Sequence, residues 1–277
     1  MIEWEQLPEL RSPVLVTSFE GWNDAGEAAT DAVDHIRQVW DAELLGELEP
    51  DDFYDFQVTR PYVKFDGDAR EVTWPTTRFY VAHAPDRDFV LAHGIEPNMR
   101  WRRFCADIIE VAEDLEVELV INLAALLADV PHTRPVPISA FATSTDLITN
   151  HGFERSGYEG PTGIVGVFQN ACDIAEIPAI SIWSAVPHYV AQSPCPKAAL
   201  ALLNRLADVT ATQIPLGDLP DEASAWQRGV EEMAAEDGEI AEYVERLERA
   251  RDSEEFTATS GDAIAAEFER YLRRREK

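Results

Sequence analysis

The feature that most constrains this fold is a set of short apolar segments separated by stretches with helical spacing. The segments with the texture of buried strands are PVLVTSF (13–19), ELVINLAALL (118–127) and PAISIWSAV (178–186). Apolar residues recur on one helical face at 25–40, 99–115 and 163–177. Helical connections of this length between strands require right-handed crossovers, so most of these strands lie in a parallel or mixed sheet. The sequence therefore predicts a three-layer α/β domain that extends to about residue 213.

Additional β-type segments lie between the first helix and the second. They are 42–48, 60–65, 70–74, 78–83 and 88–94. The dipeptide Asp66-Gly67 separates two of them and is a strong hairpin signal, because glycine tolerates the positive φ of a tight turn.

The pattern of charged and apolar residues changes after Pro215 and Pro220, where acidic and arginine-rich faces surround one apolar stripe. Heptad-like spacing, with Asp237 in place of one member, predicts a single helix over 226–247 that carries this stripe. The stripe residues are Trp226, Val230, Met233, Ile240, Val244 and Leu247. Residues 253–261 break the pattern, and a final helix is predicted around 264–272. We therefore expect an α/β domain at 1–215 and a C-terminal helical hairpin at 216–277. The stripe is a candidate interface, with the main domain or with a neighbouring subunit.

Charge and cysteine content exclude several classes of protein. The chain has 277 residues, with 52 acidic against 23 basic side chains and a formal net charge of -29. Such a surface repels nucleic acid and anionic membranes. The three cysteines are too few and too scattered for a disulfide framework, and the histidines lack metal-ligand spacing. The N-terminal residues lack the basic start of a secretory signal, so we expect a cytoplasmic protein without metal or cofactor.

The first candidate site is the stretch SFEGWNDAGEAAT (18–30), which connects a strand to a helix. Ligands in open α/β sheets collect at the carboxyl ends of strands, so Trp22, Asn23 and Asp24 occupy a favoured position. Asn23 or Asp24 can equally cap the following helix, because their side-chain oxygens accept orphan backbone N–H groups. A carboxylate at this helix terminus would repel phosphate. A structural corner is therefore favoured over a catalytic one, while Trp22 remains unexplained by capping.

Two further segments precede helices and complete the candidate pocket. GIEPNMRWRRF (94–104) places Glu96 and Arg100 near the same sheet edge, where they form either an anion site or an ordinary ion pair. GPTGIVG (160–166) brings Thr162 to a helix start, although a structural turn is the favoured interpretation. His93 and His188 lie at expected strand ends, where local hydrogen bonding is the commoner role. We assign no catalytic residue.

Six motifs in this order resemble the actinobacterial branch of the proteasome assembly chaperone 2 family. They are GWNDAG (21–26), DDFYDF with the following RP (51–61), VTWP (72–75), GIEPNMRWRRF (94–104), GPTGI (160–164) and VPHYV (186–190). The resemblance implies a phosphorylase/hydrolase-like α/β fold and suggests a homotrimer. Eukaryotic relatives act as non-catalytic chaperones of the core proteasome particle, although they lack the long helical segment after residue 220.

The resemblance leads to a first hypothesis and leaves a rival. The first hypothesis is a homo-oligomeric binding protein that docks protein partners, proteasome subunits among them, without catalysing a reaction. The rival is an enzyme or sensor that binds a nucleoside-like or other small anionic ligand. Its pocket would consist of Trp22, Asn23, Asp24, Glu96, Arg100 and Thr162.

Overall fold

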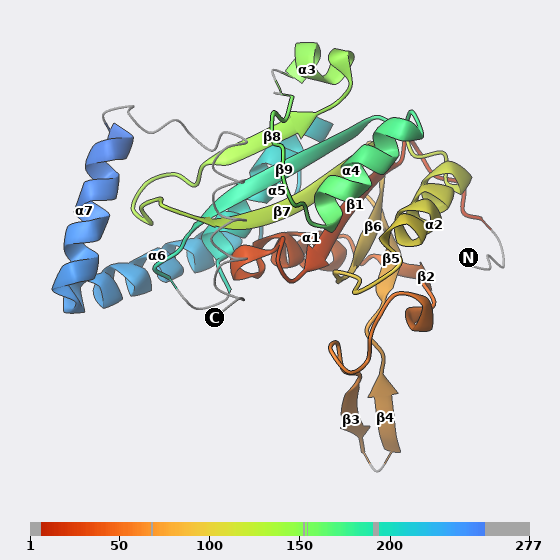
Figure 1. Ribbon diagram of the computed structural model, residues 1–277, viewed down its shortest axis with the longest axis horizontal. Helices are drawn as coiled ribbons and strands as arrows, with labels where there is room; N and C mark the ends of the chain where they lie inside the picture. The colour runs from red at the N-terminus through yellow and green to blue at the C-terminus, as the bar shows by residue number, and fades with distance from the viewer. Residues whose placement is uncertain (1–6, 68, 152, 154, 191–193, 253–277) are drawn as a thin grey trace.

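Seven strands form one central sheet in the computed structural model, which describes residues 7–67, 69–151, 153, 155–190 and 194–252. The sheet order is β2-β5-β6-β1-β7-β9-β8 (Figure 1). The strands are β1 Val14–Glu20, β2 Glu43–Glu47, β5 Thr77–His83, β6 Asp88–Ile95, β7 Leu119–Ala128, β8 Ile138–Ala142 and β9 Ala179–Pro187. The four central strands, β6, β1, β7 and β9, run parallel, whereas β5 and β8 are antiparallel to their neighbours. The predicted mixed sheet is confirmed.

Helices cover both faces of this sheet, which confirms the three-layer prediction. On one face lie α1 Ala28–Val39, α5 Pro196–Thr210 and α6 Leu219–Glu236, and on the other lie α2 Trp101–Asp114 and α4 Ile164–Ile174. The short helix α3, Thr145–His151, follows β8 at the sheet edge, and two 3-10 turns occupy Ala25–Glu27 and Pro50–Asp52. Three of these elements, β8, α3 and α5, have no counterpart among the predicted segments.

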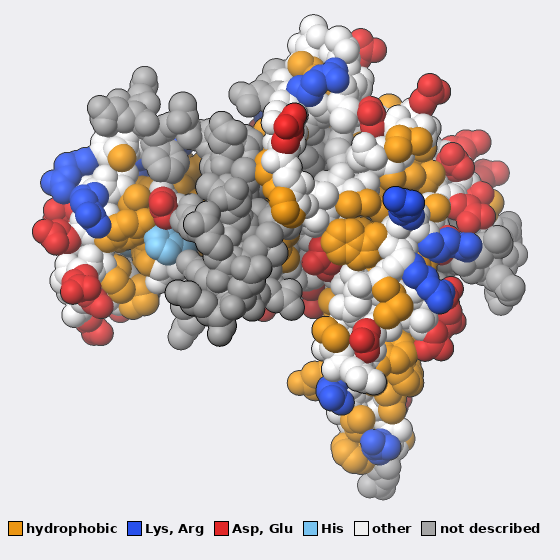
Figure 2. Space-filling model, viewed as in Figure 1, with side chains coloured by type: hydrophobic (Ala, Val, Ile, Leu, Met, Phe, Trp, Pro, Cys, Tyr) orange, Lys and Arg blue, Asp and Glu red, His pale blue; other side chains and the backbone are white. Residues whose placement is uncertain are grey.

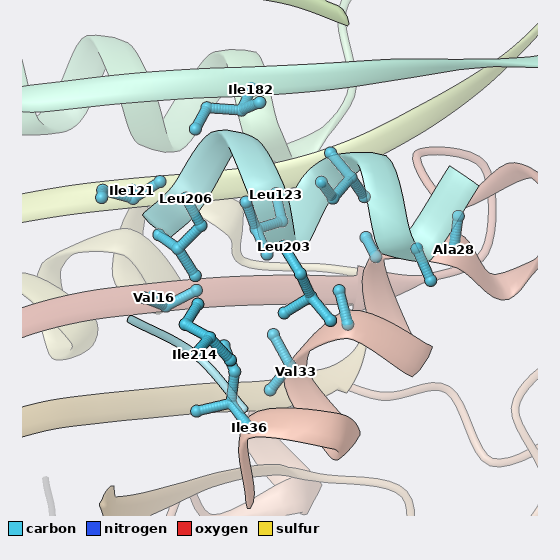
Figure 3. Close-up of a cluster of buried hydrophobic side chains, with 14 of the residues drawn as sticks. Val16, Ala28, Val33, Ile36, Ile121, Leu123, Ile182, Leu203, Leu206 and Ile214 are labelled. Atoms are coloured by element: carbon cyan, nitrogen blue, oxygen red, sulfur yellow. The ribbon is translucent and has the colours of Figure 1, made fainter. Parts of the chain in front are cut away.

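Two hydrophobic cores explain why the central strands have nearly continuous apolar sequences. In β1, Val14 and Val16 face the core beneath α1 and α5, while Leu15 faces the core beneath α2 and α4. Figure 3 shows the first core, in which Val33 of α1 and Leu203 of α5 lie against the strands. A strand buried on both faces has no solvated side, so it does not alternate apolar with polar residues.

A two-stranded hairpin stands apart from the central sheet and projects from the body of the molecule (Figure 1). It consists of β3 Tyr62–Asp66 and β4 Ala69–Thr73, and we call residues 62–73 the arm. Gly67 in its turn has φ +58, which fits the predicted hairpin signal. Tyr62 and Phe65 on the arm are 80% and 71% exposed.

The C-terminal stripe lies on two helices and not on one continuous helix, which corrects the expectation for 226–247. Helix α6 ends at Glu236 and α7 spans Gly238–Asp252, with Asp237 extended between them at ψ 108. The Asp237 carboxylate accepts hydrogen bonds from the backbone of Glu239 and Ile240, so it starts a new helix where the heptad pattern lacks an apolar member. The predicted helix at 264–272 lies outside the described residues.

Half of the stripe residues are buried within the chain. Val230, Val244 and Leu247 are each less than a tenth exposed, and Trp226 packs against the core beneath α5. Helix α7 is held in place by Arg134, which pairs with Glu248 and Asp252. Met233 is 39% exposed, and Trp226 and Ile240 are partly exposed. An interface between the stripe and a neighbouring subunit stays a prediction. The domain boundary at residue 215 remains a prediction.

Candidate functional site

The loop that follows β1 brings buried polar side chains to the carboxyl end of the sheet, and we call residues 21–26 the corner. Its backbone joins the neighbouring strand, because the carbonyl of Asn23 accepts a hydrogen bond from Ala125 of β7 at 2.8 Å. Asn23 and Asp24 are 1% and 6% exposed. Polar groups buried this deeply need partners, and those partners decide what the corner can do.

Asp24 faces the first helix and holds its terminus. Its carboxylate accepts hydrogen bonds from the backbone N–H groups of Ala29 at 2.6 Å and Thr30 at 3.2 Å. Burial raises the pKa of this carboxyl group, although the same hydrogen bonds favour its ionised form. Both carboxylate oxygens are thus occupied at the start of α1, which supports the capping interpretation for Asp24.

Glu96 connects the corner to a helix that is distant in sequence. One carboxylate oxygen, Oε1, accepts hydrogen bonds from Asn23 Nδ2 and from the backbone N–H of Ile164, each at 2.9 Å. Ile164 is the first residue of α4. The motifs GWNDAG, GIEPN and GPTGI therefore meet at a single oxygen atom. Because Glu96 occupies the end of α4, this terminus is not an open phosphate cradle.

The contact between α4 and the corner depends on Gly163. A Cβ atom at this position would lie 2.4 Å from Asn23 Oδ1 and 3.0 Å from Trp22 Cε3. Asn23 Oδ1 is itself buried and has no hydrogen-bond partner among the described residues. Glycine is therefore required for close approach, and one acceptor of the corner remains unused.

A cavity of about 360 Å³ adjoins the corner on the α4 face of the sheet. It lies between α4, strands β8 and β9, and the loop at 155–163. Three residues of the predicted pocket, Trp22, Asn23 and Thr162, line this cavity, and their role in binding a ligand stays a prediction. The volume falls at the lower end of the range for small-molecule sites, roughly 300–1,000 Å³.

The other three predicted pocket residues lie outside the lining of this cavity. Glu96 accepts a hydrogen bond from the side chain of Asn23, and Asp24 accepts one from the backbone at the start of α1. Arg100 forms an ion pair with Asp52 and not with Glu96, the partner that the sequence suggested. The arginine that lines the cavity is Arg155, from a loop without any periodic pattern. Trp183 and Tyr158, also missed, complete the aromatic lining.

The histidines at strand ends are engaged locally. His93 Nδ1 lies 2.9 Å from the hydroxyl of Ser18, and its Nε2 lies 3.5 Å from Glu20. Burial lowers the pKa of His93, which favours its neutral form. Ser18 is fully buried, so it is not placed to attack a substrate. His188 lies 3.1 Å from Asp129 and packs against Tyr243 of α7.

Other reactive groups are scarce in the part of the chain that the structure describes. Within these residues there is no cluster of His, Cys, Asp or Glu that could hold a metal ion, and no helix long and apolar enough to cross a bilayer. Cys105, Cys172 and Cys195 are free, buried thiols. Burial raises the pKa of Cys105 and Cys172 to about 12 and that of Cys195 to about 11. These thiols are therefore poor nucleophiles.

Comparison with known proteins finds a family and several similar structures. The model of the PAC2 family matches residues 18–234. A PAC2 family protein from Streptomyces avermitilis is 54% identical, with TM-score 0.80, covering 84% of this chain and 99% of that protein. A proteasome-assembly chaperone homologue from Mycobacterium tuberculosis is 52% identical, with TM-score 0.77, covering 83% of this chain and 99% of the homologue.

More distant structures share the fold. An archaeal proteasome activator from Pyrococcus furiosus is 17% identical, with TM-score 0.67, covering 84% of this chain and 98% of the activator. Among curated proteins, none matches this sequence.

Proposed function

Because this chain belongs to the PAC2 family, we propose that it acts as a non-catalytic assembly factor that binds proteasome components. The observation that carries the proposal is the 52% identity to a proteasome-assembly chaperone homologue over 83% of the chain. The polar groups of the corner support it as well, since Asp24 and Glu96 bind backbone and amide groups of the chain itself. We assign the protein to the cytoplasm, where buried free thiols remain reduced.

The arm supports a role in protein binding because it exposes apolar side chains on a thin element. Along with Tyr62 and Phe65, Val63 and Val72 are 43% and 42% exposed, and Figure 2 shows hydrophobic side chains gathered along the arm. An isolated two-stranded hairpin is at best marginally stable in water. Exposed apolar patches of this kind mark protein interaction sites.

We assign the occupant of the arm to a second copy of this chain, in a homo-oligomer for which the trimer is our working stoichiometry. Two copies that each carry a net charge of -29 repel one another. The arm and its base, residues 60–73, have three basic and three acidic side chains, so their net charge is zero. Two copies of this strongly acidic chain therefore meet the least electrostatic repulsion where the surface is apolar and has no net charge.

A capture experiment tests the proteasome interaction. The affinity-tagged full chain is added to a lysate of a proteasome-bearing actinobacterium, and bound proteins are identified by mass spectrometry. We expect core proteasome subunits to be enriched over a mock capture with an equally acidic, unrelated protein. Absence of any proteasome component, together with normal particle assembly in a strain that lacks this gene, would contradict the proposal.

Light scattering tests the arm as the contact between copies. The double variant Tyr62→Ser, Phe65→Ser is expected to shift the mass toward that of the monomer, because about 1.5–3 kcal/mol is lost for each apolar side chain no longer buried. Ile174→Ser is the matched control, since Ile174 is 76% exposed on α4, away from the arm. An unchanged mass in the arm variant, or a monomeric wild-type chain, would contradict the assignment.

A further inference from the structure

The cavity beside the corner differs in charge from the rest of the chain. Acidic residues outnumber basic ones by 52 to 23 overall, yet none of the described residues that line this cavity is acidic. Arg155 provides the single formal charge of that lining. A neutral or anionic ligand that enters here meets no repulsion from a described lining carboxylate.

Aromatic side chains form much of the apolar wall. Trp22, Phe141, Tyr158 and Trp183 all line the cavity, and Phe141 and Trp183 are 5% and 8% exposed. They come from the corner, from β8, from the loop at 155–163 and from β9. Aromatic faces favour offset or edge contacts with another flat ring, each worth about 0.5–1.5 kcal/mol beyond area burial. The wall therefore suits a planar ligand.

The polar part of the lining favours a ligand that carries a hydrogen-bond donor. Asn23 is 1% exposed, its Nδ2 donates to Glu96, and its Oδ1 accepts no hydrogen bond from the described residues. Glu96 thus fixes the amide, and its unused oxygen lies beside Gly163, which lines the cavity together with Asn23. A buried acceptor left without a partner costs about 1–3 kcal/mol, which a ligand N–H would recover.

The loop that closes the cavity is already held in place. Arg155 Nη2 donates to the backbone carbonyl of Thr143 after β8 at 3.0 Å, and the Tyr158 hydroxyl donates to the carbonyl of Pro161. The guanidinium has five N–H donors, so most of them remain for an anionic group of the ligand. Because the loop is anchored before binding, less ordering entropy is lost when a ligand arrives.

From these observations we propose that the cavity binds a planar heteroaromatic molecule with ring or amino N–H donors, of the purine nucleoside class. The ring lies among Trp22, Trp183 and Tyr158 and donates to Asn23 Oδ1. Any 5′-phosphate is directed to Arg155. This site is additional to the assembly role, and it requires neither an oligomer nor a proteasome partner.

Calorimetric titration of the purified full chain tests the proposal, with adenosine, guanosine, their 5′-monophosphates and caffeine as probes. Caffeine is a flat purine without N–H donors. We expect a nucleoside to bind, and caffeine to bind about tenfold more weakly because it leaves the Asn23 acceptor unpaired. No heat of binding for any nucleoside or nucleotide at millimolar concentration would overturn the proposal. Equal affinity for caffeine would overturn the role of Asn23.

Variants locate the binding in the cavity. Thr143→Trp fills the rim and is expected to lower nucleoside affinity at least a hundredfold, whereas Thr145→Trp, two residues away and outside the lining, is the control. Arg155→Gln is expected to weaken the monophosphate about tenfold and leave the nucleoside unchanged, with the exposed Arg102→Gln on α2 as its control. Binding that survives Thr143→Trp unchanged would place the ligand elsewhere and contradict the site. Failure of this test leaves the proteasome capture unaffected.

Discussion

The corner and the arm depart from the usual distribution of residues in opposite directions. The corner buries polar side chains, with Asn23 and Asp24 at 1% and 6% exposure, while the arm exposes Tyr62 and Phe65 at 80% and 71%. A buried polar group or an exposed apolar patch is the informative exception in a folded protein. The two exceptions raise the same question, namely which groups the polar side chains of the corner and the apolar side chains of the arm contact.

The carboxylate of Asp24 and the amide nitrogen of Asn23 have partners within the chain, whereas the large apolar side chains of the arm remain exposed. Asp24 finds the end of α1, and Asn23 finds Glu96, which also holds α4. The apolar side chains of the arm have no comparable surroundings among the described residues, because the hairpin stands apart from the central sheet. Substitutions in the corner should therefore change folding stability, and substitutions in the arm should change association.

The largest effect is expected from Glu96→Ala. It removes the acceptor for Asn23 Nδ2 and for the Ile164 backbone, leaving two donors unpaired at a buried position. We expect a loss of about 3 kcal/mol in the free energy of unfolding, measured by urea denaturation. Glu96→Gln keeps an acceptor oxygen and is the matched control, with a loss of about 1 kcal/mol. Equal stability of the two variants would show that the corner does not depend on this oxygen.

A smaller loss is expected from Gly163→Ala. The added Cβ would meet Asn23 Oδ1 at 2.4 Å and Trp22 Cε3 at 3.0 Å, so the corner and α4 must move apart. Overpacking of this kind costs about 1–3 kcal/mol. The control is Gly229→Ala in α6, where no atom lies within 4 Å of the new Cβ and a gain of about 0.5–1 kcal/mol is expected. A Gly163→Ala protein as stable as the wild type would contradict the tight contact.

The central sheet and its first helices could be predicted because the spacing of apolar residues along the sequence follows directly from which side chains are buried. The segments predicted at 13–19, 118–127 and 178–186 coincide closely with β1, β7 and β9, since strands buried on both faces have continuous apolar sequences. Helix α5 was not predicted although Leu202, Leu203 and Leu206 are fully buried. It begins at Pro196 of the Pro194-Cys195-Pro196 sequence, and no predicted strand after it marks a crossover.

The candidate site could be predicted only in part. The sequence indicates which residues lie at strand ends, but it does not indicate which loops face each other. Asn23 and Glu96 are separated by 73 positions, and their hydrogen bond has no local signature. The sequence places Arg100 near a helix start at the sheet edge, yet its side chain pairs with Asp52. Arg155 lies in an irregular loop, where neither period nor motif marks a ligand contact.

A gain in stability of about 1 kcal/mol at pH 7 is expected from Asp31→Asn on α1, near the corner. Burial, followed by the charges of Glu27, Asp24, Asp34 and Glu222, raises the pKa of Asp31 to about 6. Its pKa in the unfolded chain is about 3.9. Stability from the protonated group is therefore fully present below about pH 4 and is lost as the pH rises through about 6. We expect a gain below the full linkage value because Asp31 is partly exposed and solvent screens its charge.

The measurement for Asp31→Asn is the free energy of unfolding between pH 4 and pH 8. The difference from the wild type should grow across this interval and disappear at its acid end. Glu43→Gln, an exposed carboxylate on β2, is the control and should follow the wild-type profile. A gain that is constant with pH would mean that the substitution acts through packing and not through charge.

The smallest effect on stability is expected in the arm. In dilute protein, Tyr62→Ser with Phe65→Ser should change the free energy of unfolding by less than about 0.5 kcal/mol, because exposed side chains lose little on truncation. The same substitutions should matter only when copies associate. Hydrogen exchange of the amides at 62–73 tests this directly, since protection should rise with protein concentration in the wild type and stay low in the variant. A loss of more than about 1.5 kcal/mol in the dilute variant would show that the arm, like the corner, finds its partners within its own chain.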